Sequence, residues 1–205
     1  MKQPKNWSDI TIRKYIERVK LSRKENNDEL ATVDQLIKLA AITFECAEDE
    51  AANIPIDKLN EVNRLFNSEK PTVLINKVKI DGVYYDFELN PTKLTAAQYA
   101  GVMTAAKDLD LNLHMLLFHL ARPFKYSWFK KKYLKFDESQ TIEILERFKD
   151  IPMSVANPIV VFFFALSMEL TKNLEAYSVQ KMKEMDKILN EALTDLQSDT
   201  DGTKL

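Results

Sequence analysis

The residues that could support catalysis or metal binding are few, and their spacing favours neither. His114 and His119 are five residues apart, about 140° around a helix, whereas two ligands on one helical face are four residues apart. Cys46 has no adjacent basic residue that would lower its pKa, so we interpret it as a packed small side chain. The acidic run Ala47–Glu50 is typical of a solvated surface. We therefore predict no metal site and no cofactor.

Whole-chain properties also argue against an enzyme. The sequence contains no P-loop, no glycine-rich dinucleotide fingerprint, no HExxH motif and no GxSxG motif. Its single cysteine excludes an internal disulfide, which fits a reducing compartment. A net charge of −2, from 29 basic and 31 acidic residues, disfavours generic binding of polyanions by the whole chain. We predict that the protein is not an enzyme and has no catalytic residues.

One segment, Arg122–Phe136, combines cations with aromatic rings and contains no acidic residue. Such a mixture is typical of single-strand nucleic-acid binding and also of protein interaction hot spots. A third interpretation is that the rings pack inward and the lysines are merely solvated. For a protein partner, the candidate contacts are Trp128, Phe129 and Tyr133. For nucleic acid, which the overall charge disfavours, the candidate contacts are Arg122, Lys125, Lys130, Lys131, Lys132 and Lys135.

A second candidate surface is an apolar stripe near the C-terminus. Met182, Met185 and Leu189, followed by Ala192 and Leu196, recur at steps of three and four residues, which predicts one face of a helix. The stripe is short for an autonomous coiled coil, so it packs on the rest of the domain, or it binds a partner or a second copy. Because methionine adapts to varied surfaces, the partner-binding candidates here are Met182, Met185 and Leu189.

The elements that would position these surfaces are mostly helices, interrupted by one β-hairpin at about residues 73–89. Asp81-Gly82 is a preferred two-residue hairpin turn, and apolar side chains alternate on both sides of it. Thr95 and Gln98 then predict a capping box at the start of the next helix. We expect Arg122–Phe136 to be irregular. The predicted fold class is mainly α, a helical domain with one inserted β-hairpin and a long C-terminal helix.

We expect one helical domain over residues 1–177, a C-terminal amphipathic helix over 178–197 and a disordered tail over 198–205. The longest apolar run, Pro158–Met168, is shorter than the roughly 20 residues that span a bilayer. We interpret this run as a buried helix of a soluble protein, with no membrane contact. The first ten residues lack the apolar core of a signal peptide.

Several stretches resemble, in their order and spacing, small tail-assembly-chaperone-like proteins of tailed bacteriophages. "WSDITIRKYIERVKL", "DELATVDQLIKLAAITF" and "IPIDKLNEVNRLF" resemble the first three helices of that group. "INKVKIDGVYYDFELNPTKLTAAQYAGV" resembles its hairpin and the helix that follows, and "NLHMLLFHLARP" and "VFFFALSMEL" resemble two later helices. The resemblance covers about Trp7–Tyr177. The basic-aromatic segment and the long final helix depart from the usual pattern of the group.

The resemblance implies a non-enzymatic phage morphogenesis protein. Such a protein would bind a tail or other virion protein as an assembly chaperone in the bacterial host cytoplasm, and would hold an aggregation-prone partner in a soluble complex. The alternative is a structural component or an internal cargo protein of the virion. Self-association through the C-terminal helix stays open.

Overall fold

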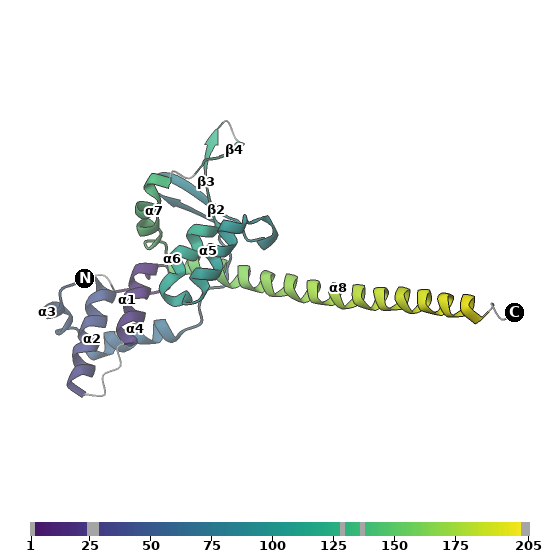
Figure 1. Ribbon diagram of the computed structural model, residues 1–205. Coiled ribbons are helices and arrows are strands. Elements are labelled where there is room, and N and C mark those ends of the chain that lie inside the picture. Colours follow the sequence, from purple (N-terminus) through teal and green to yellow (C-terminus); the bar gives the residue numbers. More distant parts are fainter. Residues whose placement is uncertain (1–2, 24–28, 128–129, 136–137, 202–205) are drawn as a thin grey trace. The chain divides into compact units, whose positions relative to one another are not determined.

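The protein is largely helical and also contains a small antiparallel sheet (Figure 1). The computed structural model describes residues 3–23, 29–127, 130–135 and 138–201. The chain divides into two compact units, Met1–Phe163 and Phe164–Leu205. The sheet and most of the helices belong to the first unit, whereas the described residues of the second unit form a single helical segment.

Four helices form the N-terminal part of the first unit. They are α1 (Ile12–Ser22), α2 (Glu29–Phe44), α3 (Glu48–Ala51) and α4 (Ile56–Asn67). The apolar side chains of α1, α2 and α4 recur at helical spacing, so each of these helices has one face to bury. Buried residues from α2 to α4 form one cluster, which consists of Ala40, Ala41, Phe44, Ala51, Ile54 and Val62. Thr11 caps α1, because its hydroxyl oxygen accepts a hydrogen bond from the Lys14 amide at 3.3 Å.

The predicted hairpin is confirmed, with strands β1 (Lys77–Ile80) and β2 (Val83–Phe87) paired antiparallel. Asp81 and Gly82 form the turn with φ angles of 46° and 83°. Both residues need a positive φ in this turn type, and aspartate and glycine adopt it at low cost. The local sequence therefore determined this element.

The prediction of a largely helical fold is confirmed, but the prediction of only one β-hairpin is wrong. Strands β3 (Ala121–Ser127) and β4 (Lys130–Tyr133) extend the hairpin to a four-stranded antiparallel sheet with the order β1-β2-β3-β4. The segment expected to be irregular is thus largely a second hairpin. Strand alternation is present in β3, where Arg122, Phe124 and Tyr126 share a face, but Pro123 and the many lysines conceal it.

Helices α5 (Ala96–Ala106) and α6 (Leu109–Leu120) connect the two hairpins, after a 3-10 turn at Pro91–Lys93. The predicted capping box is confirmed at the start of α5. The Gln98 amide donates to the Thr95 hydroxyl oxygen at 3.2 Å, and the Thr95 amide donates to the Gln98 side-chain oxygen at 3.0 Å. These reciprocal bonds satisfy two polar groups that a helix start otherwise leaves unpaired.

Helix α7 (Thr141–Phe148) leads through a short connection to helix α8 (Met153–Asp201). The N-terminal segment before α1 runs beside this connection and bonds to it through the main chain. The Met153 amide donates to the Ile10 carbonyl at 2.7 Å, and the Ser154 amide donates to the Trp7 carbonyl at 3.2 Å. We call this pairing of residues 7–13 with residues 149–154 the N-terminal clamp. It caps α8 with backbone carbonyls in place of a capping side chain.

Helix α8 differs from the two helices that the sequence suggested. It is continuous through Tyr177 and extends to Asp201, into the tail expected to be disordered, and the two units of the chain meet at Phe163. The chain contains neither proline nor glycine between Pro158 and Gly202, so nothing in that stretch breaks the helix. Pro158 lies in the second turn of α8, where it removes one main-chain hydrogen bond.

The interior of the first unit is filled by large apolar side chains from α6, β3, α7 and the beginning of α8. Tyr85 on β2 meets Phe148 on α7 edge-on, with 5.2 Å between ring centres. The fully buried side chains of this region include Leu116, Leu117, Leu120, Phe124, Phe148, Met153 and Ile159. One face of the sheet therefore packs on α7 through Tyr85.

Helices α5 and α6 approach each other closely at Gly101. A methyl group built on Gly101 would overlap the imidazole ring of His119. Alanine normally stabilises an exposed helix interior by about 1 kcal/mol relative to glycine. Here we expect Gly101→Ala to destabilise the protein by about 1–3 kcal/mol, because the ring must move. Urea unfolding followed by circular dichroism measures the difference.

His119→Ala provides the matched second change, since it removes the ring that the methyl group would meet. The double variant should be more stable than the sum of the two single effects predicts. A stabilising effect of Gly101→Ala alone would contradict the close approach of the two helices.

Candidate interaction surfaces

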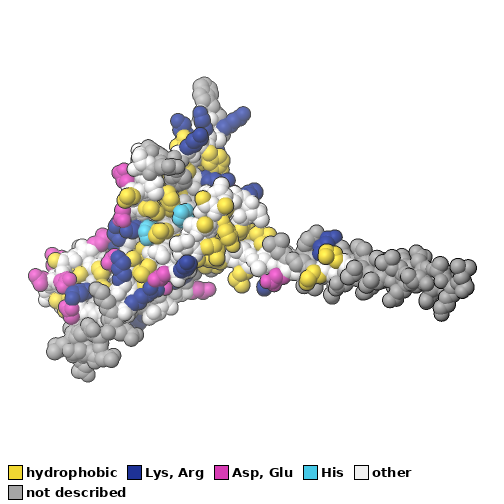
Figure 2. Space-filling model, in the orientation of Figure 1, with side chains coloured by type: hydrophobic (Ala, Val, Ile, Leu, Met, Phe, Trp, Pro, Cys, Tyr) yellow, Lys and Arg dark blue, Asp and Glu magenta, His cyan; other side chains and the backbone are white. Residues whose placement is uncertain are grey.

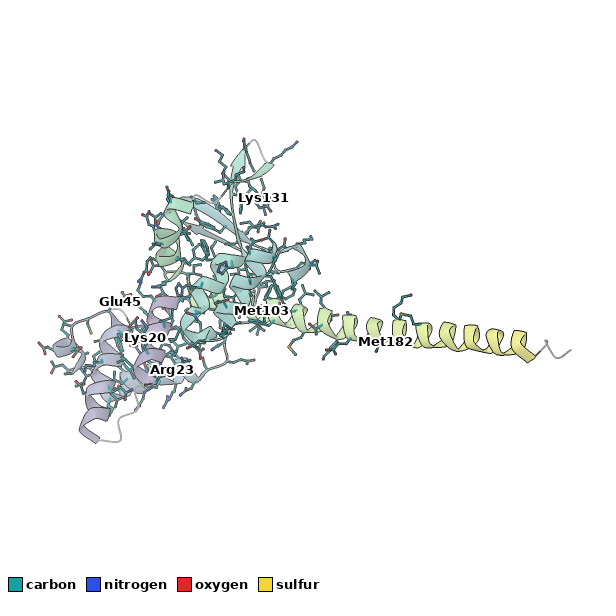
Figure 3. The ribbon with its side chains drawn as sticks, viewed as in Figure 1. Lys20, Arg23, Glu45, Met103, Lys131 and Met182 are labelled. Atoms are coloured by element: carbon teal, nitrogen blue, oxygen red, sulfur yellow. The ribbon has the colours of Figure 1, made fainter. Side chains whose placement is uncertain are left out.

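A buried carboxylate organises one face of the sheet. Asp86 lies on β2, and its Oδ2 accepts hydrogen bonds from the Lys131 ammonium at 2.8 Å and from the Tyr133 hydroxyl at 3.0 Å, both on β4. Figure 3 labels Lys131 on β4. The hydrogen bond to Asp86 raises the pKa of Lys131. Asp86 thus brings together Lys131, a candidate nucleic-acid contact, and Tyr133, a candidate protein contact.

A second ion pair on the same face involves Arg122 and Glu88. The Arg122 guanidinium lies 2.9 Å from the Glu88 carboxylate and 5.0 Å from the centre of the Tyr133 ring. Glu88 is buried, so its charge requires this partner. Asp86 Oδ1 and Arg122 Nε are also buried, and neither has a hydrogen-bond partner in the described part of the chain. Arg122 and Lys131 are therefore both paired with buried acids, Glu88 and Asp86.

The aromatic side chains of this face form a cluster around Phe124, which is fully buried. Tyr84 stacks on Phe124 with 5.6 Å between ring centres, and Tyr126 meets Phe124 edge-on at 5.4 Å. Tyr126 and Tyr133 remain about half exposed. The interpretation that rings pack inward thus applies to Phe124, whereas the two tyrosines also face solvent. Trp128 and Phe129 lie outside the described residues.

The other predicted cations of this segment are exposed. Figure 2 shows lysine side chains gathered at the β3–β4 hairpin. Lys125, Lys130, Lys132 and Lys135 have no ion-pair partner among the described residues. The six candidate cations thus divide into two that are paired with buried acids and four that face solvent.

The C-terminal methionines lie on the second unit and are exposed. The exposed fractions are 61% for Met168, 58% for Met182 and 66% for Met185. Figure 3 labels Met182 on this helix. The helical period of 3.6 residues places these three side chains within an arc of about 100°. Leu189 lies in α8, but its side chain is outside the described part of the structure. Met168 is the one member of this stripe that the sequence analysis did not select.

Another exposed apolar patch lies on the first unit. Figure 2 shows hydrophobic side chains gathered over α5 and the beginning of α8. The exposed large hydrophobic residues of these two segments include Tyr99 and Met103 on α5 and Val161 and Phe162 on α8. The segment Met153–Asn173 is long and apolar enough to cross a membrane by length and composition, and 33% of its most apolar window is buried in the protein. The uninterrupted apolar run Pro158–Met168 covers only part of this segment, so the sequence analysis underestimated the length of the apolar helix.

A hollow of about 270 Å³ between α1 and α4 carries cations that the sequence analysis did not select. The Arg18 guanidinium lies 4.0 Å from the centre of the Phe66 ring and donates to the Asn63 side-chain oxygen at 3.1 Å. Burial lowers the pKa of Arg18. Lys70 lies 5.1 Å from the centre of the Tyr15 ring. These pairs join residues more than 40 positions apart, so no local pattern could predict them.

The two histidines are both half-buried. His114 and His119 lie on α6, and burial lowers the pKa of both, that of His114 to about 4. His114 Nδ1 is buried and has no hydrogen-bond partner within the described ranges. Burial raises the pKa of the Cys46 thiol. The described residues contain no group of three or more histidine, cysteine or acidic side chains that could hold a metal ion.

The candidate partner contacts therefore fall on different elements. Tyr133 lies on the sheet of the first unit, and Met182 and Met185 lie on the helix of the second unit. Comparisons of the chain with protein-family models, with curated proteins and with solved structures found no match.

The contribution of the buried carboxylate can be measured through Asp86→Asn. We expect this change to lower the free energy of unfolding by about 1–3 kcal/mol, because Lys131 and Tyr133 lose an anionic acceptor. In a double-mutant cycle with Lys131→Gln, the two effects should couple by about 1 kcal/mol. Glu143→Gln, which alters an exposed ion pair with Arg147, should change stability by less than about 0.5 kcal/mol. Strict additivity in the cycle would contradict the Asp86–Lys131 contact.

The low pKa of His114 predicts a pH-dependent stability. The unfolded chain binds a proton on this residue near its ordinary pKa of 6.5, whereas the folded chain binds it near 4. Between these values the unfolded state binds more protons, so stability should fall as the pH is lowered from about 6.5 toward 4. Lys149 and Arg13 add repulsion to the burial effect, and Glu146 opposes it.

Urea unfolding at several pH values between 7.5 and 4.5 measures this dependence. His114→Gln should retain only the smaller dependence that the other groups, including His119, supply. An unchanged pH dependence in His114→Gln would exclude the assignment.

Proposed function

We propose that this protein is a non-enzymatic assembly chaperone of tailed-bacteriophage morphogenesis, which binds a tail or other virion protein in the bacterial host cytoplasm. The order of sequence segments that resemble small tail-assembly-chaperone-like proteins supports the phage assignment. The exposed methionines of α8 support protein binding, and they are the observation on which the proposal rests.

The methionine face has a physical reason to bind. Burial of one methionine side chain stabilises a complex by about 1.5–3 kcal/mol, and each 1.4 kcal/mol is a tenfold change in affinity. The described residues of the second unit form one helix, so Met168, Met182 and Met185 have no other element of that unit to pack on. Flexible, unbranched methionine side chains also adjust to partner surfaces of different shape.

An apolar helix face suits a chaperone, because the partner segment that it covers is the kind that aggregates when exposed. A groove-binding or helix-pairing mode would use anchors three, four and seven residues apart. Met182 and Met185 are three residues apart, and Leu189 follows four residues later. By binding the folded or partly folded partner, the helix shifts that partner away from self-association by mass action.

The test is affinity purification of the tagged full chain from cells infected by the phage that encodes it. We expect a tail or other virion protein to co-purify with the wild-type chain. Met182→Gln with Met185→Gln should reduce the recovered amount at least tenfold, because two apolar contacts are lost while helix propensity is nearly unchanged. Glu169→Gln with Asn173→Gln puts two glutamines on the opposite face of the same helix and should leave recovery unchanged.

Two further outcomes bear on the proposal. Equal recovery with both double variants, or recovery of no virion protein, would refute binding through the methionine face. Mass spectrometry of purified particles then separates the chaperone from a structural or cargo protein, since a chaperone should be absent from particles. Presence at a fixed copy number would assign the chain to the virion instead.

A further inference from the structure

The β3–β4 hairpin extends beyond the rest of the sheet as a two-stranded ribbon. Strand β2 pairs with β3 over Ala121–Phe124, whereas β4 pairs with β3 over Phe124–Ser127. The part of β3 after Phe124 therefore has β4 as its only neighbouring strand among those described. Figure 1 shows this hairpin projecting from the first unit. Residues 125–127 and 130–132 form what we call the basic ribbon.

One face of the basic ribbon presents lysines that repel one another. Lys125 lies directly opposite Lys132, and Lys130 lies opposite Ser127 on the same face. All three lysines are exposed, and none has an ion-pair partner in the described ranges. Like charges directly opposite on paired strands are destabilising. Lys131, on the other face, is neutralised by Asp86, so the chain compensates one face of the ribbon and not the other.

We propose that the uncompensated face of the basic ribbon binds the phosphate backbone of nucleic acid. This binding site is separate from the methionine face of α8 and does not depend on it. A strand rise of about 3.3 Å per residue, opposite Cβ atoms about 5 Å apart and diagonal ones about 7–8 Å apart place the three lysines side by side on one face. A two-stranded ribbon also fits the major groove of a duplex, which carries about one phosphate charge per 1.7 Å of its axis.

The composition of this face favours phosphate over a protein partner. Protein hot spots depend on buried aromatic, apolar or arginine anchors, whereas this face offers Lys125, Lys130, Lys132 and Ser127. Lysine acts as a compact point charge without the planar fork with which arginine recognises carboxylates. Such a face neutralises phosphates without reading sequence. Arg122, which could have made bidentate contacts, is paired with Glu88.

Fluorescence anisotropy with a labelled 20-base-pair DNA duplex of random sequence tests the proposal on the full chain. Three phosphate contacts predict a slope of about −2.7 for log affinity against log salt concentration. The affinity should therefore fall about 40-fold between 50 and 200 mM salt. Absent binding at 50 mM salt, or binding that does not depend on salt, would overturn the proposal.

A triple variant, Lys125→Gln with Lys130→Gln and Lys132→Gln, should bring the salt slope close to zero. The change also removes like-charge repulsion, so the fold should be retained, and circular dichroism confirms this. Lys58→Gln with Lys93→Gln and Lys107→Gln removes the same charge from exposed positions elsewhere and should leave the slope unchanged. Equal losses in both variants would overturn the proposal.

A binding measurement with anionic vesicles that contain phosphatidylserine completes the test, because a bilayer surface also attracts lysines. Ribbon-dependent binding to these vesicles without binding to the duplex would assign the ribbon to a membrane surface and overturn the nucleic-acid proposal.

Discussion

The N-terminal clamp is the constraint on which the first unit depends. Main-chain bonds join Ile12 to Ile151 and Arg13 to Lys149, in addition to the two that cap α8. Ile10, Ile12, Ile151 and Met153 are all buried, so the bonds between these residues are shielded from water. The clamp fixes the start of α1, the end of α7 and the start of α8 against one another. The helices that support the sheet take their positions from it.

Local elements of this fold were predictable, and non-local ones were not. The Asp81-Gly82 turn and the Thr95–Gln98 capping box each require only neighbouring residues, and the structure contains both. Strand β3 was missed because its pairing partners on β2 lie 34 to 40 residues earlier, with Tyr84 and Phe124 the most distant pair. A similar separation in sequence concealed the acidic partners of the segment Arg122–Phe136, which itself contains no acidic residue. Arg122 and Lys131 appeared unpaired because their carboxylate partners lie on β2 or directly after it.

The surface of α8 was only partly predictable from the sequence. Periodicity identified Met182 and Met185 as one helical face, and both side chains are exposed. A face of that period is equally compatible with packing on the domain, so the sequence alone left both interpretations open. The helix was also longer than its apolar stripes suggested. Without proline or glycine between the stripes, two apparent helices joined into one.

The clamp also imposes an order on folding during synthesis. Residues 7–13 leave the ribosome before their main-chain partners, which lie about 140 positions later and follow after roughly 7–28 seconds at 5–20 residues per second. During this interval α1 lacks these bonds, whereas the residues of α2, α3 and α4 that share a hydrophobic cluster, among them Phe44 and Val62, are already synthesised. That cluster can form as soon as residue 67 is available. We expect α2, α3 and α4 to associate before the end of α7 is available to complete the first unit.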